Sequence, residues 1–122
     1  MARLRVLIAD DEEGVRESLS LILSADHEIL SVPDGDQAME AINRQGPFDL
    51  ILLDIKMPKR DGLDVLRQVK AKGLSTPIVM LTAYQSVELA KEAVKLGASD
   101  YVTKPFNREH VLSAVRGVLR HS

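Results

Sequence analysis

The feature of this sequence that most constrains its fold is a regular alternation of short apolar segments with longer segments of helical spacing. The apolar segments are rich in Val, Ile and Leu, and two of them, LILL (50–53) and IVML (78–81), contain no polar residue. Strands that are apolar throughout are typical of parallel sheets covered by helices on both faces. The expected strands are 4–9, 28–32, 50–53, 78–81 and 101–103.

Between the expected strands, apolar residues recur at the three- and four-residue spacing of amphipathic helices. The first helical stripe runs through 15–23, and Gly73 and Gly97 follow the third and fourth stripes, where they predict helix ends. Asn107 precedes the last stripe and predicts an N-cap. The remaining stripes lie within 38–42, 63–70, 87–96 and 111–119.

Strand and helix alternating five times predict an α/β domain built on a parallel sheet. A common arrangement is a doubly wound five-stranded sheet of order 2-1-3-4-5, the flavodoxin-like order, with helices on both faces. The length of 122 residues suits one domain, so we expect residues 1–122 to form a single domain. The chain has no cysteine, which excludes disulfides and thiolate metal sites.

The composition argues against a nucleic-acid or membrane role. The formal net charge is −2, without the basic stripe expected of a nucleic-acid surface. With two Phe, two Tyr and no Trp, the chain also lacks aromatic platforms for base stacking. The first apolar run ends at Asp10, which makes it too short for a signal peptide or a membrane span. We therefore expect a cytoplasmic protein.

Polar side chains that suit metal or phosphate chemistry follow four of the five expected strands. Asp10 and Asp11 follow the first strand, Asp54 the third, Thr82 the fourth and Lys104 the fifth. Ligands of open parallel sheets bind at the carboxyl ends of the strands, where the strand order reverses, here between strands one and three. The three aspartates should therefore converge, and their mutual repulsion predicts a divalent cation that prefers oxygen ligands, Mg²⁺ with Mn²⁺ as the alternative.

Together these residues suit the transfer of a phosphoryl group to a carboxylate. A carboxylate nucleophile can form an acyl phosphate, with Mg²⁺ and Lys104 stabilising negative charge and Thr82 donating a hydroxyl. Taken singly, Thr82 is better explained as a strand former and Lys104 as a solvated lysine, so the functional interpretation depends on the joint pattern. Glu12 and Glu13 are explained as acids at the start of a helix, where they complement the helix dipole.

Two further aspartates, Asp49 and Asp100, come before their strands instead of after them. In a parallel sheet they should lie at the edge opposite the three converging aspartates. No functional role is expected for either.

The motifs resemble the receiver domain of bacterial two-component response regulators. The resemblance spans nearly the whole chain and is carried by the paired acids of IADDEE, by LLDIKMP around Asp54, by MLTAY around Thr82 and by YVTKPF around Lys104. The segment TAYQSVELAKEAVKLGASDYVTKPF (82–106) is similar to receivers of the nitrogen-regulation (NtrC) type. The resemblance implies a regulatory phosphoacceptor, not an enzyme with a separate substrate. Asp54 would be phosphorylated by a histidine kinase, a histidine phosphotransfer protein or a small phosphodonor.

The resemblance also implies which residues hold the metal and tune the reaction. Asp10 would contact the ion through water, whereas Asp11, Asp54 and the backbone carbonyl of Lys56 would bind it directly. Lys56 and Tyr84 correspond to positions that tune the lifetime of the phosphoryl group, in a direction that the sequence leaves open.

Further implied roles concern the switch. Thr82 and Lys104 would bind the phosphoryl oxygens, and Tyr101 would turn inward as the threonine moves. The surface of the fourth helix, fifth strand and fifth helix would then change and be read by an output domain, a downstream protein or a second copy in a homodimer. The Lys104–Pro105 peptide bond is expected to be cis, which is cheap only before proline.

Other functions share parts of this pattern. An aspartyl-phosphate hydrolase places its acids as Asp-x-Asp after the first strand and usually carries a cap domain, whereas Asp10 and Asp11 are adjacent and 122 residues leave no room for a cap. A flavodoxin-like electron carrier needs a neutral phosphate loop where this chain is acidic. Whether the chain is a free-standing phosphorelay intermediate or part of a longer regulator stays open.

Overall fold

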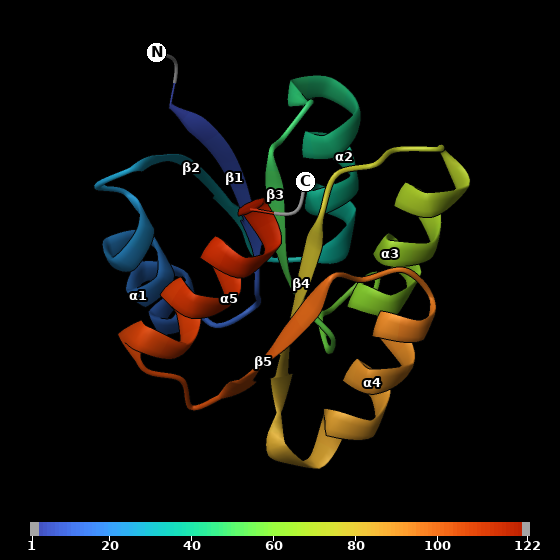
Figure 1. Cartoon of the computed structure of the whole chain (residues 1–122). Helices are drawn as coiled ribbons and strands as arrows, with labels where there is room; N and C mark the ends of the chain where they lie inside the picture. Colours follow the sequence, from blue (N-terminus) through green and yellow to red (C-terminus); the bar gives the residue numbers. More distant parts are fainter. Residues whose placement is uncertain (1–2, 121–122) are drawn as a thin grey trace.

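A computed structural model describes residues 3–120 of the chain. Its five strands form one parallel sheet in the order β2-β1-β3-β4-β5, which confirms the predicted fold class and strand order (Figure 1). The strands are β1 (Leu4–Ala9), β2 (His27–Val32), β3 (Leu50–Asp54), β4 (Ile78–Ala83) and β5 (Asp100–Lys104). The helices are α1 (Glu13–Leu23), α2 (Gly35–Gln45), α3 (Gly62–Ala71), α4 (Val87–Lys95) and α5 (Arg108–Arg120), with a 3₁₀ turn, η1 (Tyr84–Ser86), before α4.

The helices form one layer on each face of the sheet, α1 and α5 on one side and α2, α3 and α4 on the other (Figure 1). Because successive side chains of a strand point to opposite faces, β1 contributes Val6 and Ile8 to one apolar cluster and Leu7 and Ala9 to the other. The central strand β3 is buried along its whole length. Full burial of a Leu or Ile side chain contributes about 1.5–3 kcal/mol, so these two clusters dominate the stability of the domain.

The helix ends follow the sequence signals. Gly73 and Gly97 adopt positive φ angles of 75° and 119° just after α3 and α4, a conformation that favours glycine. The Asn107 carboxamide oxygen accepts a hydrogen bond from the amide of His110 at 2.9 Å, as expected of an N-cap. β1 has the predicted bounds, and the other four strands are longer than predicted by one or two residues; β2, for example, begins at His27 and β5 spans Asp100–Lys104. Within residues 3–120, no helix combines the length and apolarity needed to span a membrane.

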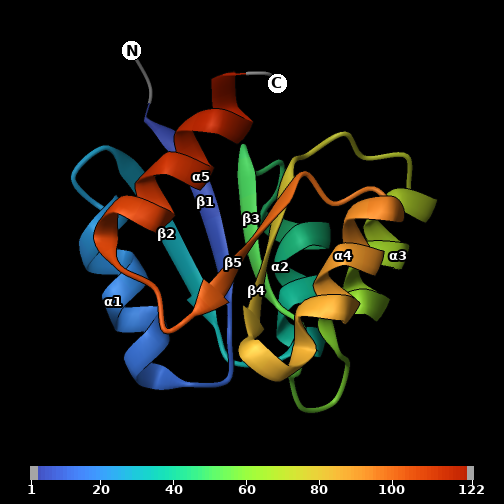
Figure 2. The same cartoon turned by 60° about the horizontal axis from the view of Figure 1, so that its bottom comes forward.

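The sheet topology brings the carboxyl ends of all the strands to one edge, which Figure 2 turns toward the viewer. β1 pairs with β2 on one side and with β3 on the other. The connection after β1 therefore leads to one side of that strand, and the connection after β2 crosses back to the other side. This reversal opens a crevice at the carboxyl ends of β1 and β3.

Candidate functional site

Two buried aspartates meet at the carboxyl ends of β1 and β3. Asp10 directly follows β1 and Asp54 is the last residue of β3. The register that pairs Ala9 with Leu53 brings the two positions side by side. Asp10 is fully buried and Asp54 is 5% exposed, so neither carboxylate is solvated as an ordinary surface aspartate would be. Buried carboxylates are unfavourable unless they are paired.

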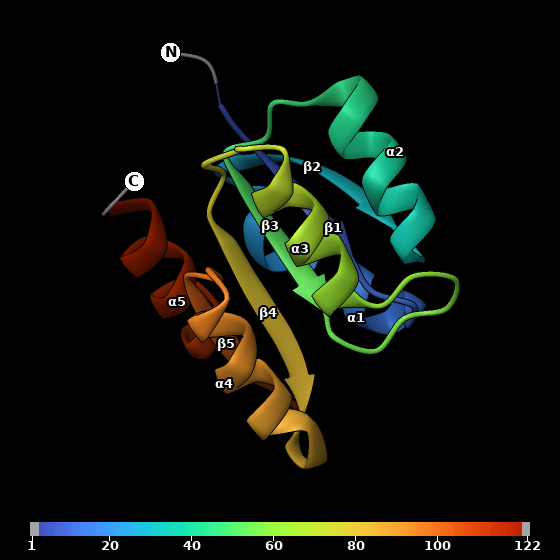
Figure 3. The same ribbon diagram turned by 90° about the vertical axis from the view of Figure 1, so that its right-hand side faces the viewer.

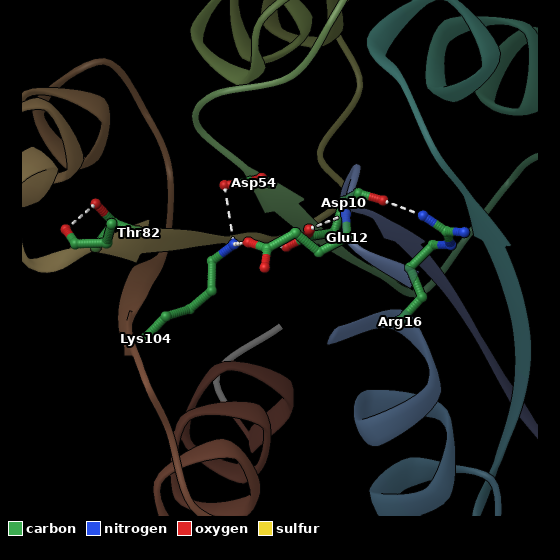
Figure 4. A network of polar contacts seen from close by, with 7 residues as sticks. Asp10, Glu12, Arg16, Asp54, Thr82 and Lys104 are labelled. Carbon is green, nitrogen blue, oxygen red and sulfur yellow. Dashed lines mark hydrogen bonds and ion pairs between the residues drawn. The ribbon is translucent and has the colours of Figure 1, made fainter. Parts of the chain in front are cut away.

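The cation that pairs with them is Lys104, at the end of β5. Its Nζ donates a hydrogen bond to Oδ2 of Asp10 at 2.9 Å and lies 3.5 Å from Oδ1 of Asp54 (Figure 4). It also lies 3.4 Å from Oε1 of Glu12. One ammonium group thus faces three carboxylates contributed by two segments that are far apart in the sequence.

One lysine does not compensate for all of this negative charge. Burial first, and then the charge of Asp10, raise the pKa of Asp54 to about 7, although Lys104 acts in the opposite direction. Burial also raises the pKa of Asp10 above its ordinary value. For Lys104, burial favours the neutral form, but the hydrogen bond to Asp10 and the neighbouring carboxylates raise its pKa overall. The crevice therefore has a deficit of positive charge that a bound cation would relieve.

The β1–α1 loop is held by contacts that the sequence did not predict. The amide of Glu12 donates to Oδ1 of Asp10 at 2.9 Å, and the Arg16 guanidinium donates to the Asp10 carbonyl at 2.7 Å (Figure 4). Glu12 occupies the N-cap position of α1, but its side chain makes no capping hydrogen bond and faces Lys104 instead. The interpretation of Glu12 as a helix-start acid is therefore incomplete, whereas Glu13 does lie in the first turn.

The acidic residues suit a hard divalent cation. Carboxylate oxygens of Asp10, Asp11 and Glu12 all lie within 4.8 Å of one another. This group includes Glu12, which was not among the predicted ligands. A cavity of about 520 Å³ is lined by Asp11, Glu12, Asp54 and Lys56, among others. An oxygen-rich crevice that is part buried and part open is the kind of site in which Mg²⁺ keeps some of its waters.

The remaining predicted site residues lie around the same edge. Thr82 is fully buried and its hydroxyl donates to the Ala83 carbonyl at 3.0 Å (Figure 4). Tyr84 in η1 is 79% exposed, and Tyr101 in β5 is half-buried against the apolar cluster on the α4 side. The Lys104–Pro105 peptide bond is cis. The Thr82 hydroxyl is therefore hydrogen-bonded within its own strand and, among residues 3–120, makes no hydrogen bond to these carboxylates.

The sequence model of the response regulator receiver domain matches residues 6–116. The chain belongs to the response regulator receiver domain family. Over 120 residues it is 39% identical to the transcriptional regulatory protein DltR of Streptococcus agalactiae and 40% identical to the response regulator MprA of Mycobacterium leprae. These alignments cover 98% of this chain but 53% and 52% of the two relatives, so the chain spans about half their length.

Solved structures agree with this assignment. The crystal structure of the receiver domain of NtrX from Brucella abortus superposes with a TM-score of 0.89 at 33% identity, covering 96% of this chain and 99% of that one. A structure of NtrX with ADP gives a TM-score of 0.91 at 31% identity, covering 98% of this chain and 28% of that one. The narrower assignment to the NtrC type stays a prediction.

Membership of the family defines the general function. Receiver domains are regulatory domains of two-component systems that act in phosphorylation-driven signalling, and the family generally binds Mg²⁺ at an acidic pocket.

Proposed function

We propose that Asp54 is the phosphoacceptor of this receiver domain and that its phosphorylation depends on Mg²⁺. The observation that carries the proposal is the buried Asp54 carboxylate, with the Lys104 ammonium 3.5 Å from its Oδ1 and Asp10 on the neighbouring strand end. A carboxylate oxygen of Asp54 attacks phosphorus, an oxygen–phosphorus bond forms, and the bond to the donor breaks with its electron pair leaving on the donor. Lys104 is placed to bind a phosphoryl oxygen once it is released from Asp10.

Asp10, Asp11, Asp54 and the backbone carbonyl of Lys56 would hold the metal, which is Mg²⁺, with Mn²⁺ as the alternative. The bound ion would neutralise charge on the phosphoryl oxygens. Burial and the charge of Asp10 raise the pKa of Asp54, so without a metal this carboxyl holds its proton to higher pH than a free aspartate, and that proton must leave before attack. Positive charge from a cation or from Lys104 favours the reactive carboxylate form.

Thr82 is the proposed switch residue. Its hydroxyl would leave the Ala83 carbonyl, to which it donates at 3.0 Å, and donate to the phosphoryl group, while Tyr101 turns inward. The two tyrosines Tyr84 and Tyr101 line one groove with residues of β5 and α5, so their motion would alter the α4–β5–α5 surface. Phosphorylation would thereby shift the population toward the conformer that a partner reads. Thr82→Ala should still accept phosphate but leave the amide chemical shifts of α4 largely unchanged on phosphorylation.

Lys56 lines the cavity that holds Asp54, and Tyr84 stands between Ala83 and Gln85, which line the same cavity. Both side chains are exposed and are proposed to tune the lifetime of the phosphoryl group. From these positions either side chain would crowd or polarise an attacking water. Substitution of either should change the rate of dephosphorylation without abolishing phosphorylation.

We further propose that residues 1–122 form one receiver domain, which acts in the cytoplasm on an output that regulates transcription. Support comes from DltR, whose name describes a transcriptional regulatory protein and of which this chain covers about half. The phosphoryl donor would be a histidine kinase or a histidine phosphotransfer protein, and phosphorylation would favour a homodimer. A free-standing phosphorelay intermediate is the second candidate within the same chemistry.

The deciding experiment is intact-mass spectrometry after incubation with acetyl phosphate, with and without Mg²⁺. The parent protein should gain one phosphoryl group only with Mg²⁺, Asp54→Asn should gain none, and the control Asp49→Asn should behave like the parent. An unchanged phosphorylated fraction in Asp54→Asn would contradict the proposal. Steady turnover of organic phosphates would instead favour an aspartyl-phosphate hydrolase. If the parent gains no mass, formation of a beryllofluoride complex tests whether the site binds a phosphoryl analogue at all.

A further inference from the structure

The loop that follows Asp54, residues 55–61, packs against the N-terminal end of α2 (Figure 3). The contact is between backbones: a Cβ atom added to Gly35 would lie 1.9 Å from the carbonyl oxygen of Arg60. No side chain fits at that distance, so only glycine allows this approach. The first residue of α2 is therefore in direct contact with the loop next to the proposed phosphoacceptor.

Two ion pairs join the loop to the start of α2, and a third joins it to α3. The Arg60 guanidinium donates from Nε to Oδ1 of Asp36 at 3.2 Å and lies 3.6 Å from Oδ2 of Asp64 in α3. The Lys59 ammonium lies 3.7 Å from Oδ2 of Asp34, a buried carboxylate that also caps α2. Lys59 has a φ of 68°, a left-handed conformation that glycine would adopt more easily, so the lysine is kept at a position where its backbone is unfavourable.

At the end of the loop, the backbone of Gly62 packs against the backbone at the end of β3. A Cβ atom on Gly62 would lie 2.1 Å from the carbonyl oxygen of Asp54, and the Gly62 amide donates to the Ile55 carbonyl at 2.8 Å. The Gly62 contacts thus join the two ends of the loop at the end of β3, and Lys59 and Arg60 attach the loop to α2. Lys56, whose carbonyl is a proposed metal ligand, lies between these two attachments.

We propose that Asp34, Gly35 and Asp36, here called the α2 clamp, are positioning residues for the phosphorylation site. The clamp holds Arg60 and Lys59, and through them holds the loop that carries Lys56, which lines the same cavity as Asp54. It thereby sets the affinity for Mg²⁺ and the lifetime of the phosphoryl group without touching either. This inference rests on the proposed function of Asp54 and assigns the clamp a role that helix capping alone does not supply.

The first test compares Mg²⁺ affinity in Gly35→Ala with that in the parent, by titration of the metal alone followed by NMR. Residues that orient metal ligands typically change affinity by one or two orders of magnitude, so we expect a loss of about tenfold or more. Gly117→Ala is the matched control, because a Cβ there has no atom within 4 Å. It should bind Mg²⁺ as the parent does. Equal affinity in folded Gly35→Ala and parent would overturn the proposal.

Arg60→Gln keeps the proposal testable if Gly35→Ala does not fold. Because its ion pairs are partly solvated, we expect a smaller loss of Mg²⁺ affinity, about threefold at low salt, that closes at high salt as the pairs are screened. A purely structural role would lower the midpoint of thermal unfolding and leave the affinity of the folded protein unchanged, which would overturn the proposal.

The lifetime of the phosphoryl group gives a second reading in the same proteins. Arg60→Gln loaded with acetyl phosphate should lose its phosphoryl group at a different rate from the parent, and Gly117→Ala should not. If the parent itself gains no phosphoryl group on Asp54, the proposed function fails while the Mg²⁺ comparison still decides the clamp. Equal lifetimes together with equal Mg²⁺ affinities would overturn the clamp while leaving Asp54 as the acceptor.

Discussion

Aspartates lie at both ends of the strands, which form two opposite edges of the sheet, here called the amino edge and the carboxyl edge. At the amino edge, nearby backbone amides and water satisfy the hydrogen-bonding capacity of the aspartates. Oδ2 of Asp49 accepts a hydrogen bond from the amide of Arg5 at 2.7 Å, and Oδ1 of Asp100 accepts from the amide of Tyr101 at 2.8 Å. Asp49 is exposed and Asp100 half-buried, so water also solvates them. These carboxylates accept hydrogen bonds from backbone amides at the start of strands and have the environment of ordinary surface aspartates.

At the opposite edge, the same residue type is buried and shares one cation. Asp10 and Asp54 both face Lys104, and Asp54 is held in a site that raises its pKa to about 7. The difference does not come from the residue or from its position beside a strand. It comes from the strand order, which brings two strand ends together at the reversal and removes water from both carboxylates.

The largest expected effect follows from removing the shared cation. Lys104→Met should destabilise the metal-free protein by about 3 kcal/mol at pH 8, because it leaves buried carboxylates without a partner. The loss should shrink at pH 5, where protonation removes much of the charge on Asp54. Arg5→Met at the other edge should cost only about 1 kcal/mol, since its contacts are partly solvated. Urea unfolding at both pH values measures this, and equal losses for the two variants would break the comparison.

The next effect has the opposite sign. Asp54→Asn should stabilise the metal-free protein by about 2 kcal/mol at pH 8, because it removes a buried charge that repels Asp10. The pKa of Asp54 is raised from 3.8 to about 7 in the folded state, so the folded protein binds more protons than the unfolded chain between these values. Stability from this group is present below about pH 4 and is lost as the pH rises through about 7.

Urea unfolding between pH 4 and pH 8 checks this sign. The free energy of unfolding of the parent should decline toward neutral pH more steeply than that of Asp54→Asn. Parallel pH profiles for the two proteins would show that Asp54 is ionised in the folded state as easily as in water. The difference between the two edges of the sheet would then have no electrostatic basis.

Much of this comparison was accessible from the sequence. Within residues 3–120, the apolar runs and helical stripes predict the five strands and the five α-helices but not the 3₁₀ turn η1, because periodicity determines which side chains face the two clusters. The same pattern separated the edges: Asp10, Asp54, Thr82 and Lys104 were predicted at the carboxyl ends, where the structure places them. Strand ends were less accurate, since pairing of the backbone extends β5 to Lys104 beyond its apolar residues.

What the sequence could not show are contacts between segments that no local pattern links. The pairing of Glu12 with Lys104 depends on how the β1–α1 loop meets β5, and the bond from Arg16 to the Asp10 carbonyl depends on the turn of α1. The close approach of Gly35 to Arg60 is likewise visible only in three dimensions. In each case a residue with an ordinary local role acquires a second one through tertiary structure.

Metal binding sharpens the comparison further. Asp11→Ala should weaken Mg²⁺ binding about tenfold, which corresponds to about 1.4 kcal/mol. The reason is that Asp11 supplies oxygens to the cluster of carboxylates at the carboxyl ends of the strands. Asp100→Ala removes an aspartate from the other edge and should leave the affinity unchanged. Isothermal titration with MgCl₂ measures both. A similar loss in the two variants would indicate a general effect of net charge in place of a defined site.

The smallest expected change in the free energy of unfolding comes from Asp49, at the amino ends of the strands. Asp49→Ala removes the acceptor for the Arg5 amide and should cost about 0.5–1 kcal/mol in urea unfolding, because water replaces a hydrogen bond that is already exposed. Asp49→Asn keeps an oxygen in the same place and should cost less still. Neither variant should change the phosphorylated fraction after incubation with acetyl phosphate. If Asp49→Asn did reduce phosphorylation, the two edges would be coupled through β3, which connects Asp49 to Asp54 by a single buried strand. A carboxylate whose hydrogen bonds are made locally at one end of the strands would then still influence phosphorylation at the other end.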